Sequence, residues 1–250
     1  MGMNVLVVGE VCRDVTYYCN VSRISPEAPV PVADLIWKSM AEGMAGNVDC
    51  NLQALGVNTT FVHQRLTQHI TKTRYVEQKT GQHLLRADDT HPNITPLDVA
   101  TIENIDDYDA IVISDYNKGF IEYSTAPKLR TLFNGPILVD SKKPDLGCFS
   151  GCIVKINEME HSRAKSIPRS TIVTLGSKGA LYDGKVYPSE PVKMFDVCGA
   201  GDTFLAGLTY MMLKGEPIGP CIEFANKCAG IAVQHSGTYT LKKTDIDSIL

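Results

Sequence analysis

The chain has 250 residues, of which 44% are hydrophobic and 21% charged, and its formal net charge is −4. These values predict a globular protein with a sizeable core, built as one large α/β domain or two small ones. No long basic run occurs, which argues against nucleic-acid binding. The first apolar run, residues 4–8, is too short for a signal peptide or a membrane span, so no membrane partner is expected.

The cysteines and the absent motifs narrow the function further. Eight cysteines are scattered without a CxxC pair, and the closest two, Cys148 and Cys152, lack partners at zinc-ligand spacing. Without a secretory signal we expect reduced thiols and a cytoplasmic protein. No P-loop and no set of protein-kinase motifs occurs, and no GxGxxG follows the first strand, which argues against a dinucleotide oxidoreductase.

The first half of the chain predicts a buried strand and an exposed β lid. Residues 4–8 are apolar and β-branched, as in a central parallel strand, and Asp14 follows near the carboxyl edge where such sheets bind ligands. A carboxylate can accept two hydrogen bonds from a diol, although Asp14 could equally be a solvated loop acid. Three prolines within residues 26–31 exclude a helix there. We expect the lid to be built from about residues 15–38 and 70–88.

Two cations lie within the second lid segment. A KTG turn at residues 79–81 joins two strands, and Lys72 and Arg74 stand two positions apart on the first of them, so both project from one face. Such a pair suits a substrate phosphate, or is a solvated strand face. Residues 41–48 lead into a predicted helix that ends at Leu55 and is capped by Gly56, and Thr95 followed by Pro96 predicts another helix start.

Strands with polar exits fill the second half. Apolar runs at residues 110–114, 137–139, 153–156 and 172–175 predict buried strands. Residues 218–235 predict a long helix with one apolar face, and a short helix begins at Thr244. The polar residues at the strand exits are Asp115 and Lys118, Asp140 and Lys142, Asn157 and Glu160, and the turn of Gly176, Ser177, Lys178 and Gly179.

The nine residues DVCGAGDTF, at positions 196–204, carry the strongest pattern. Gly199, Ala200 and Gly201 allow a close backbone approach, and a helical apolar pattern starts at Ala200. A helix N-terminus after glycines presents free N–H groups and the positive end of the dipole to an anion. Asp202 in the first turn is either an N-terminal charge partner or a base beside a bound anion. Read alone, the string could also be an ordinary glycine-rich helix start.

This string resembles the signature D-[TV]-x-G-A-G-D of ribokinase-like (PfkB-type) carbohydrate kinases. The resemblance implies that Asp202 is the catalytic base, and that Gly199, Ala200 and Gly201 hold the transferring phosphoryl group. The segment GMAGNV at residues 43–48 is similar to the family's G-G-A-A-N-V, which implies that Asn47 binds sugar and Gly43 allows close approach. Met44 replaces a glycine. If this position needs a positive φ, Met44 is strained; if it only needs space, Met44 narrows the pocket. A third alternative is that Gly46 adopts the positive φ instead.

Three segments resemble the heptose 7-phosphate kinases of lipopolysaccharide precursor synthesis within this family. They are SRISPEAPVPV at residues 22–32, ITKTR at residues 70–74, and DYNKG at residues 115–119. In that group the first segment is a β flap over the sugar and a dimer contact, so a homodimer through the lid is implied. The substrate-binding residues implied in addition to Gly43 and Asn47 are Asp14, Arg23, Lys72, Arg74, Asp115 and Lys118.

The nucleotide-binding half is similar to the same family. Asn157 and Glu160 match its N-x-x-E element, which implies that they hold Mg²⁺ through water, although N-x-x-E is common at helix starts. A monovalent cation, K⁺, would lie near Asp196 and Gly237. The residues implied in ATP binding are Lys142, Asn157, Thr174, Gly176, Ser177, Gly179 and Asn226.

The resemblance covers nearly the whole chain, so we expect one ribokinase-like α/β domain over residues 1–250, mostly parallel, with helices on both faces and a small β lid. The strand–helix stretch that the family carries after His63 is missing, and the helix after Glu160 is cut short. The implied reaction is Mg-ATP-dependent phosphorylation of D-glycero-D-manno-heptose 7-phosphate at its anomeric hydroxyl. The alternatives are a kinase for fructose phosphate, ribose or a nucleoside, and a catalytically weak sugar-binding or scaffold protein.

Overall fold

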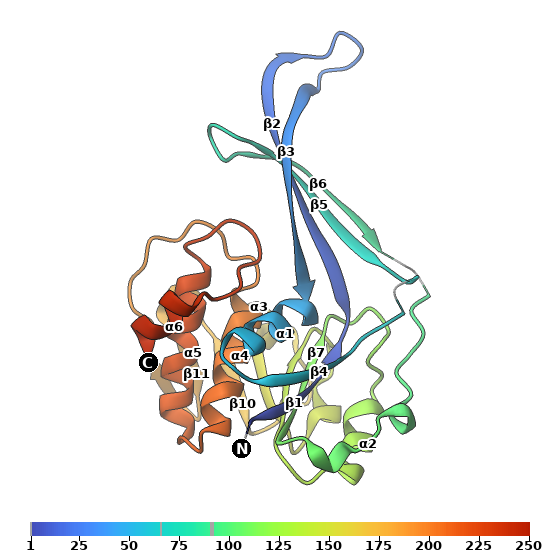
Figure 1. The fold of residues 1–250 in the computed structure, drawn as a ribbon, viewed down its shortest axis with the longest axis vertical. Coiled ribbons are helices and arrows are strands. Elements are labelled where there is room, and N and C mark those ends of the chain that lie inside the picture. Colours follow the sequence, from blue (N-terminus) through green and yellow to red (C-terminus); the bar gives the residue numbers. More distant parts are fainter. Residues whose placement is uncertain (1, 66, 91–92) are drawn as a thin grey trace.

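The structure, a computed structural model, describes residues 2–65, 67–90 and 93–250. Its body is an eight-stranded sheet, and a four-stranded sheet rises from one end of the body as an arm (Figure 1). In spatial order the body sheet contains β12 (Lys185–Tyr187), β11 (Ala180–Tyr182), β10 (Thr171–Thr174), β9 (Ile153–Asn157), β8 (Ile137–Ser141), β7 (Ala110–Asp115), β1 (Asn4–Gly9) and β4 (Asn58–Val62).

The body sheet is parallel from β4 to β10, and β11 is the strand that pairs antiparallel, with β10 on one side and β12 on the other. Its central strands are buried on both faces, as the continuous apolar runs predicted, and Val5 to Val8 of β1 are fully buried, whereas the edge strand β4 is partly exposed. Because the strands are parallel, their carboxyl ends meet at one edge. The polar residues after β1, β7, β8 and β9 are therefore brought together there.

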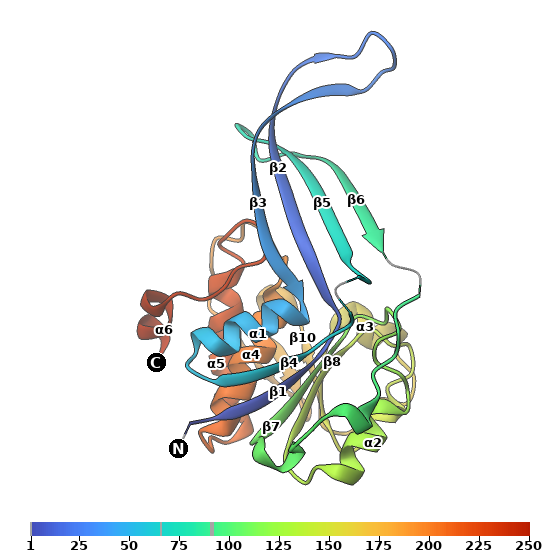
Figure 2. The same ribbon diagram turned by 45° about the vertical axis from the view of Figure 1, so that its right-hand side comes forward.

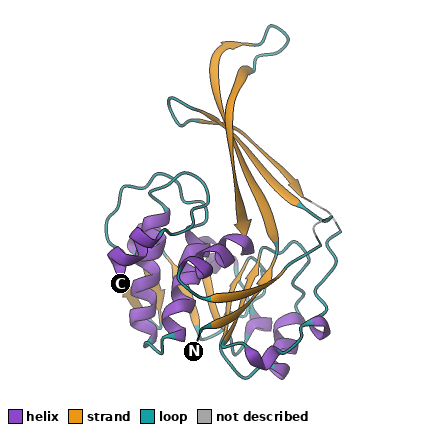
Figure 3. Cartoon of the chain, in the orientation of Figure 1, coloured by secondary structure: helices purple, strands orange, loops and turns teal. Residues whose placement is uncertain are grey.

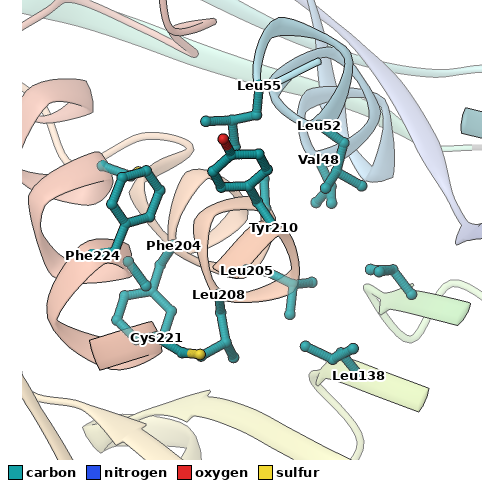
Figure 4. Packing of buried hydrophobic residues seen from close by; sticks show 14 of the residues in the cluster. Val48, Leu52, Leu55, Leu138, Phe204, Leu205, Leu208, Tyr210, Cys221 and Phe224 are labelled. Atoms are coloured by element: carbon teal, nitrogen blue, oxygen red, sulfur yellow. The ribbon is translucent and has the colours of Figure 1, made fainter. Parts of the chain in front are cut away.

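Helices cover both faces, as expected. Val5 and Val7 of β1 face one helical layer, while Leu6 and Val8 face the other, because successive side chains of a strand alternate. Figure 4 shows the first layer, where Leu205 and Leu208 lie near Leu138 of the sheet. This layer contains α1 (Ala45–Ala54), α4 (Ala200–Leu213), α5 (Ile218–Ala232) and α6 (Lys243–Ile249), and the other contains α2 (Thr125–Leu132) (Figure 2).

The arm is the expected lid, with longer strands than the sequence suggested. The arm stands away from the helical layers, and Figure 3 shows it as a sheet without helices on it. The ring of Tyr18 stacks on that of Trp37 with 3.8 Å between the centroids. In the order β3-β2-β5-β6 the arm contains β3 (Pro31–Met44), β2 (Val11–Ile24), β5 (Ile70–Glu77) and β6 (His83–Thr90).

Two expectations about connections are confirmed and one is wrong. β4 ends at Val62 and β5 begins at Ile70, and the described residues between them contain no helix, while α3 is confined to Glu158–Arg163. The expected helix start at Thr95 does not form. The Thr95 backbone N–H and hydroxyl both bond to the Gln68 amide, and only a 3₁₀ turn, Val99–Thr101, follows, with Asp98 as its cap. Tertiary bonds to Gln68 have replaced the local cap.

Met44 adopts the positive φ of the missing glycine. Its φ is 57° and its ψ −135°, at the junction between β3 and α1, and its side chain is 2% exposed. Gly46 is not among the positive-φ residues, so the expectation that it takes over the special conformation is wrong. Gly46 instead makes room for close packing, since a Cβ there would lie 3.0 Å from Val11 and Glu42 side-chain atoms. The strain stays at Met44.

This strain predicts an unusual order of stability at Met44. Met44→Gly and Met44→Ala both lose the buried side chain, but only Gly relieves the backbone. We expect the Gly variant to be more stable than the Ala variant by about 1–3 kcal/mol in denaturant unfolding. The control is Ala54→Gly, in the last turn of the same helix, which should destabilise by about 0.5–1 kcal/mol. An Ala variant at residue 44 as stable as the Gly variant would contradict the strain.

Candidate active site

Two glycines at the start of α4 are required by geometry. Gly199 has a φ of 75°, and a Cβ there would lie 2.6 Å from Asn47 Nδ2. A Cβ on Gly201 would lie 2.5 Å from Lys155 Nζ. Both positions therefore bring backbone close to polar side chains at the beginning of a 14-residue helix. The free N–H groups of this first turn and a nearby ammonium form an arrangement that can bind an anion.

Asp202 lies in this first turn with its side chain buried, and it is 2% exposed. Tyr116 donates its hydroxyl to Oδ1 at 2.8 Å, and Asn47 donates Nδ2 to Oδ2 at 3.3 Å. Asn51 donates to Asn47 Oδ1 at 3.1 Å, which fixes the direction of the Asn47 amide. Burial, and secondly the charge of Asp140, raise the pKa of Asp202 to about 6. This carboxylate can take a proton near neutral pH.

A buried ion pair lies beside the turn. Lys155 Nζ and Asp140 Oδ2 are 2.7 Å apart, and both side chains are at most 10% exposed. Burial alone would lower the pKa of Lys155, but the nearby acids Asp140, Asp202 and Glu160 together outweigh burial and hold that pKa above its usual value. Lys155 was not predicted as a functional residue from the sequence. A lysine inside the apolar run of β9 was the available signal, since buried lysines are rare unless paired.

Asp14, Gly43 and Arg74 are brought together at the base of the arm. Arg74 Nη1 bonds to Asp14 Oδ1, and Arg74 Nη2 donates to the Cys198 sulfur at 3.3 Å. Gly43 has no side chain because a Cβ would overlap the Asp14 carboxylate. The Asp14–Arg74 pair is buried, and through Cys198 it joins the arm to the turn that precedes Asp202. The resemblance-based assignment of these residues to one site agrees with this proximity.

Lys72 and Lys142 also reach the site. Their Nζ atoms lie 5.1 and 4.1 Å from the centroid of the Tyr116 ring, the residue whose hydroxyl contacts Asp202. Tyr116 was not singled out from the sequence, although it lies within the DYNKG segment. Two cations from different sheets thus converge beside the candidate base.

Three residues that were expected to bind the substrate lie apart from the contacts described above. The Asp115 carboxylate is buried and bonded to the Ser141 hydroxyl at 2.7 Å and to Lys143 at 3.3 Å, so it supports the sheet edge and does not face a ligand. The Lys118 side chain is exposed, and its backbone N–H bonds to Glu10. Arg23 is exposed one residue before the end of β2, and β2 ends near the tip of the arm (Figure 1). The structure therefore does not bring Arg23 together with Asp202.

The expected nucleotide residues border a different part of the edge. Thr174 ends β10 beside Asn157 of β9, and the turn from Gly176 to Gly179 follows it. A cavity of about 190 Å³ lies between α5, α6 and the loop after β12, and Asn226 is among its lining residues. The Asn226 amide donates to the Tyr187 carbonyl at 2.9 Å, so it also ties α5 to β12.

Asn157 and Glu160 form a capping box at the start of α3. Asn157 Oδ1 accepts from the Glu160 N–H at 2.8 Å, and Glu160 Oε2 accepts from the Asn157 N–H at 2.9 Å. This is the helix-start interpretation of N-x-x-E. The box uses the single side-chain oxygen of Asn157 and one carboxylate oxygen of Glu160, which leaves Glu160 Oε1 outside it. No group of three or more metal-ligating side chains occurs in the described ranges. Mg²⁺ commonly takes one or two carboxylates together with water and phosphate oxygens, so this donor set fits it.

Asp196 and Gly237, the expected surroundings of a monovalent cation, are adjacent. The Gly237 N–H donates to Asp196 Oδ2 at 2.9 Å, and the Cys198 N–H donates to Oδ1 at 3.0 Å. The next residue, Thr238, has a buried hydroxyl without a hydrogen-bond partner in the described part of the chain. Its atoms lie within 3.4 Å of the Cβ that Gly199 lacks. A buried hydroxyl without a partner is unusual in proteins, and a bound water or ion is one way to satisfy it.

A larger cavity lies elsewhere. It measures about 520 Å³ and is lined by residues at the amino ends of β1 and β4, among them Asn4 and Asn58, together with Tyr108. None of the candidate site residues lines it. In the described ranges, no helix combines the length and the apolarity needed to cross a membrane.

Comparisons with known proteins identify the family of the chain. Residues 102–245 match the pfkB family carbohydrate kinases. The chain is 30% identical to the bifunctional protein HldE of Campylobacter jejuni subsp. doylei, with 98% of this chain and 64% of that protein covered. It is 29% identical to the bifunctional protein HldE of Nitratiruptor sp., with 99% and 65% covered. The chain therefore spans less than two thirds of the length of these relatives.

Solved structures show the same fold at low identity. Ribokinase from Thermotoga maritima superimposes with a TM-score of 0.70 at 17% identity, covering 99% of both chains. Phosphofructokinase-2 from Escherichia coli in complex with potassium gives 0.73 at 16% identity, covering 100% of this chain and 98% of that one. The fold is thus ribokinase-like. The chain belongs to the pfkB family of carbohydrate kinases, and it is a phosphotransferase that acts on a sugar hydroxyl.

Proposed function

We propose that this kinase phosphorylates a sugar phosphate, D-glycero-D-manno-heptose 7-phosphate, at the anomeric hydroxyl, with Asp202 as the base. The observation that carries the proposal is the Asp202 carboxylate, buried beside the Gly199–Gly201 turn with its two oxygens held by Tyr116 and Asn47. A buried carboxylate with a pKa of about 6, next to an anion-binding helix start, suits proton removal at the point of phosphoryl transfer.

The chain's own residues would divide the work as follows. Asp202 takes the proton of the acceptor hydroxyl. At the same time the hydroxyl oxygen of the sugar bonds to the γ-phosphorus, and the bond between the γ-phosphorus and the leaving ADP breaks. The N–H groups of the turn and the Lys155 ammonium stabilise the charge on the phosphoryl oxygens. Mg²⁺, held by Glu160 and Asn157 through water, would neutralise the triphosphate. Asp14, Gly43 and Asn47 would orient the sugar.

The choice of a phosphorylated acceptor depends on the arm. Arg74 is already paired with Asp14, which leaves Lys72 as the half-buried cation of β5 beside Tyr116. Two of the three segments that resemble heptose 7-phosphate kinases contribute to this region, because ITKTR carries Lys72 and DYNKG carries Tyr116, whereas the flap forms the outer end of the arm. We therefore propose that Lys72 binds the substrate's existing phosphate.

The nucleotide would bind on the other side of Asp202. We propose that the turn from Gly176 to Gly179, with Thr174 and Lys142, contacts the phosphates and ribose, and that adenine occupies the cavity of about 190 Å³ that Asn226 lines. The adjacency of Asp196 and Gly237 supports a monovalent-cation site there.

Asp202→Asn should remove the base while keeping the size of the side chain. We expect kcat for heptose 7-phosphate to fall by about 10²–10⁴-fold. In the parent enzyme kcat/KM should fall tenfold per pH unit below about pH 6, because only the carboxylate accepts a proton and the pKa of Asp202 is about 6.

The measurement is steady-state turnover against a panel of phosphorylated and plain sugars. Asp183→Asn, in the turn between β11 and β12 with a φ of 47°, is the matched control and should leave turnover unchanged. If the Asp202 variant turns over sugar as fast as the parent, the assignment of the base is wrong. If the parent prefers fructose phosphate, ribose or a nucleoside, the substrate assignment is wrong and the base assignment stands.

Lys72→Met should separate phosphate recognition from sugar recognition. It keeps the aliphatic chain and removes the charge, so we expect KM for the phosphorylated sugar to rise about 10–100-fold, the loss of one charge-assisted bond. KM for the unphosphorylated sugar should stay the same. Lys79→Met, in the turn of the same hairpin, serves as the control. An equal rise of KM for both sugars would show that Lys72 does not bind the phosphate.

We further propose that two copies pair through their arms. The arm exposes large apolar side chains on β3 and β6, including Leu35, Trp37, Met40 and Leu85, each at least 47% exposed. Solvated apolar side chains gathered on a sheet without helices favour an interface. Met40→Glu should shift the parent's dimer mass toward the monomer in sedimentation, while Lys38→Glu on the same strand should have a smaller effect. A monomeric parent would contradict this proposal.

A further inference from the structure

Tyr116 connects the candidate base to the arm and to the body. It is the first residue after β7, and its hydroxyl donates to Asp202 Oδ1 at 2.8 Å. Lys72 of the arm lies 5.1 Å from the ring centroid, and Lys142, after β8, lies 4.1 Å from it. The function proposed above uses this tyrosine only as a hydrogen-bond partner of the base and gives it no part in the transfer itself, although no other hydroxyl is hydrogen-bonded to Asp202 in the described ranges.

A buried acid holds the backbone of Tyr116 in place. The Glu10 side chain is fully buried, and its carboxylate accepts three backbone N–H groups. These come from Tyr116 at 2.8 Å, Lys118 at 3.1 Å and Phe120 at 3.2 Å. Glu10 follows β1 directly, so the loop after β7 is fastened to the centre of the sheet. The position of the Tyr116 hydroxyl is therefore set by the body and not by a mobile surface loop.

Resting on the function proposed above, we propose that Tyr116 is a positioning residue for the phosphoryl transfer. Its hydroxyl fixes the rotation of the Asp202 carboxylate and occupies Oδ1 in place of a water. Oδ2, next to Asn47, is then the oxygen that accepts the proton of the sugar hydroxyl. With Oδ1 occupied, a water has less access to the base, so the γ-phosphate is protected from transfer to water when no sugar is bound.

The charges around the base agree with this role. Asp140 from β8 raises the pKa of Asp202, while Lys155 from β9 and the bonds from Tyr116 and Asn47 lower it. Around Tyr116 itself, the acids Asp202 and Asp140 and the thiol of Cys12 raise the phenol pKa, after burial, so the phenol stays protonated and remains a donor. The ammonium groups of Lys72 and Lys142 face its ring.

Tyr116→Phe tests the proposal because it keeps the ring and its two cation contacts and removes only the hydroxyl. Without that bond to the carboxylate, the pKa of Asp202 rises, so the acid limb of kcat/KM should move to higher pH by about one unit. ATP hydrolysis without sugar should increase severalfold, since water gains access to Oδ1. KM for the sugar phosphate should change little, because the ring and Lys72 stay in place.

Tyr123→Phe is the matched control. Tyr123 is 49% exposed and also has a lysine, Lys143, 5.0 Å from its ring centroid, but it does not contact Asp202. We expect its pH profile and its sugar-independent ATP hydrolysis to equal those of the parent. Thermal unfolding of both variants checks that each is folded. If Tyr116→Phe unfolds early, Tyr116→Trp provides a second ring without the hydroxyl at that position.

Three outcomes overturn the inference in different ways. A parent that phosphorylates sugar, with a Tyr116→Phe variant whose acid limb and ATP hydrolysis are both unchanged, removes the positioning role and leaves the proposed function standing. A parent that phosphorylates no sugar of the panel removes the proposed function, and the role of Tyr116 with it. A variant that loses activity equally at all pH values, without more ATP hydrolysis, shows a purely structural role and also overturns the inference.

Discussion

The burial of one carboxylate constrains the whole site. Removing a carboxylate from water is unfavourable, so Asp202 remains usable as an ionised base only because neighbouring elements supply partners. Asn47 comes from the start of α1, Tyr116 directly follows β7, and Lys155 comes from β9. Asp140 has the opposite effect and raises the pKa of Asp202. Together these effects bring the pKa of Asp202 to about 6. Each effect depends on the register of a different strand or helix.

The junction between the arm and the body is a second constraint, and it includes a strained residue. Gly43 lies against Asp14, Met44 takes a positive φ, and Asn47 follows one turn later beside Asp202. The backbone must turn sharply here because the end of β3 lies within hydrogen-bonding reach of β2, whereas α1 begins immediately afterwards and runs toward α4. A methionine tolerates this conformation only because its side chain is buried in the core on the side of the sheet that α2 covers. The surrounding packing thus enforces the conformation.

Sequence reasoning was most successful where the chemistry is local. The Gly199–Gly201 turn, Asp202 and the strands of the body could be predicted because backbone freedom, helix starts and apolar runs are properties of neighbouring residues. Tyr116 and Lys155 could not be ranked, because their importance comes from burial against α4, which tertiary packing creates. The prediction at Thr95 was wrong for a related reason: a distant Gln68 side chain bonds both the backbone N–H and the hydroxyl of the expected cap. Assignments that rest on resemblance alone, such as Arg23, stay predictions.

The shortness of the chain need not weaken the site, because the missing pieces lie away from it. The direct connection from β4 to β5 follows the edge strand, and the cavity of about 520 Å³ at the amino ends of β1 and β4 borders that edge. The residues around Asp202 come instead from α1, α4 and the carboxyl ends of β7 to β9, which are all present. α3 is reduced to six residues, yet its first turn retains the Asn157–Glu160 capping box. Loss of peripheral helices therefore removes cover from the sheet edge and leaves the groups around the carboxylate in place.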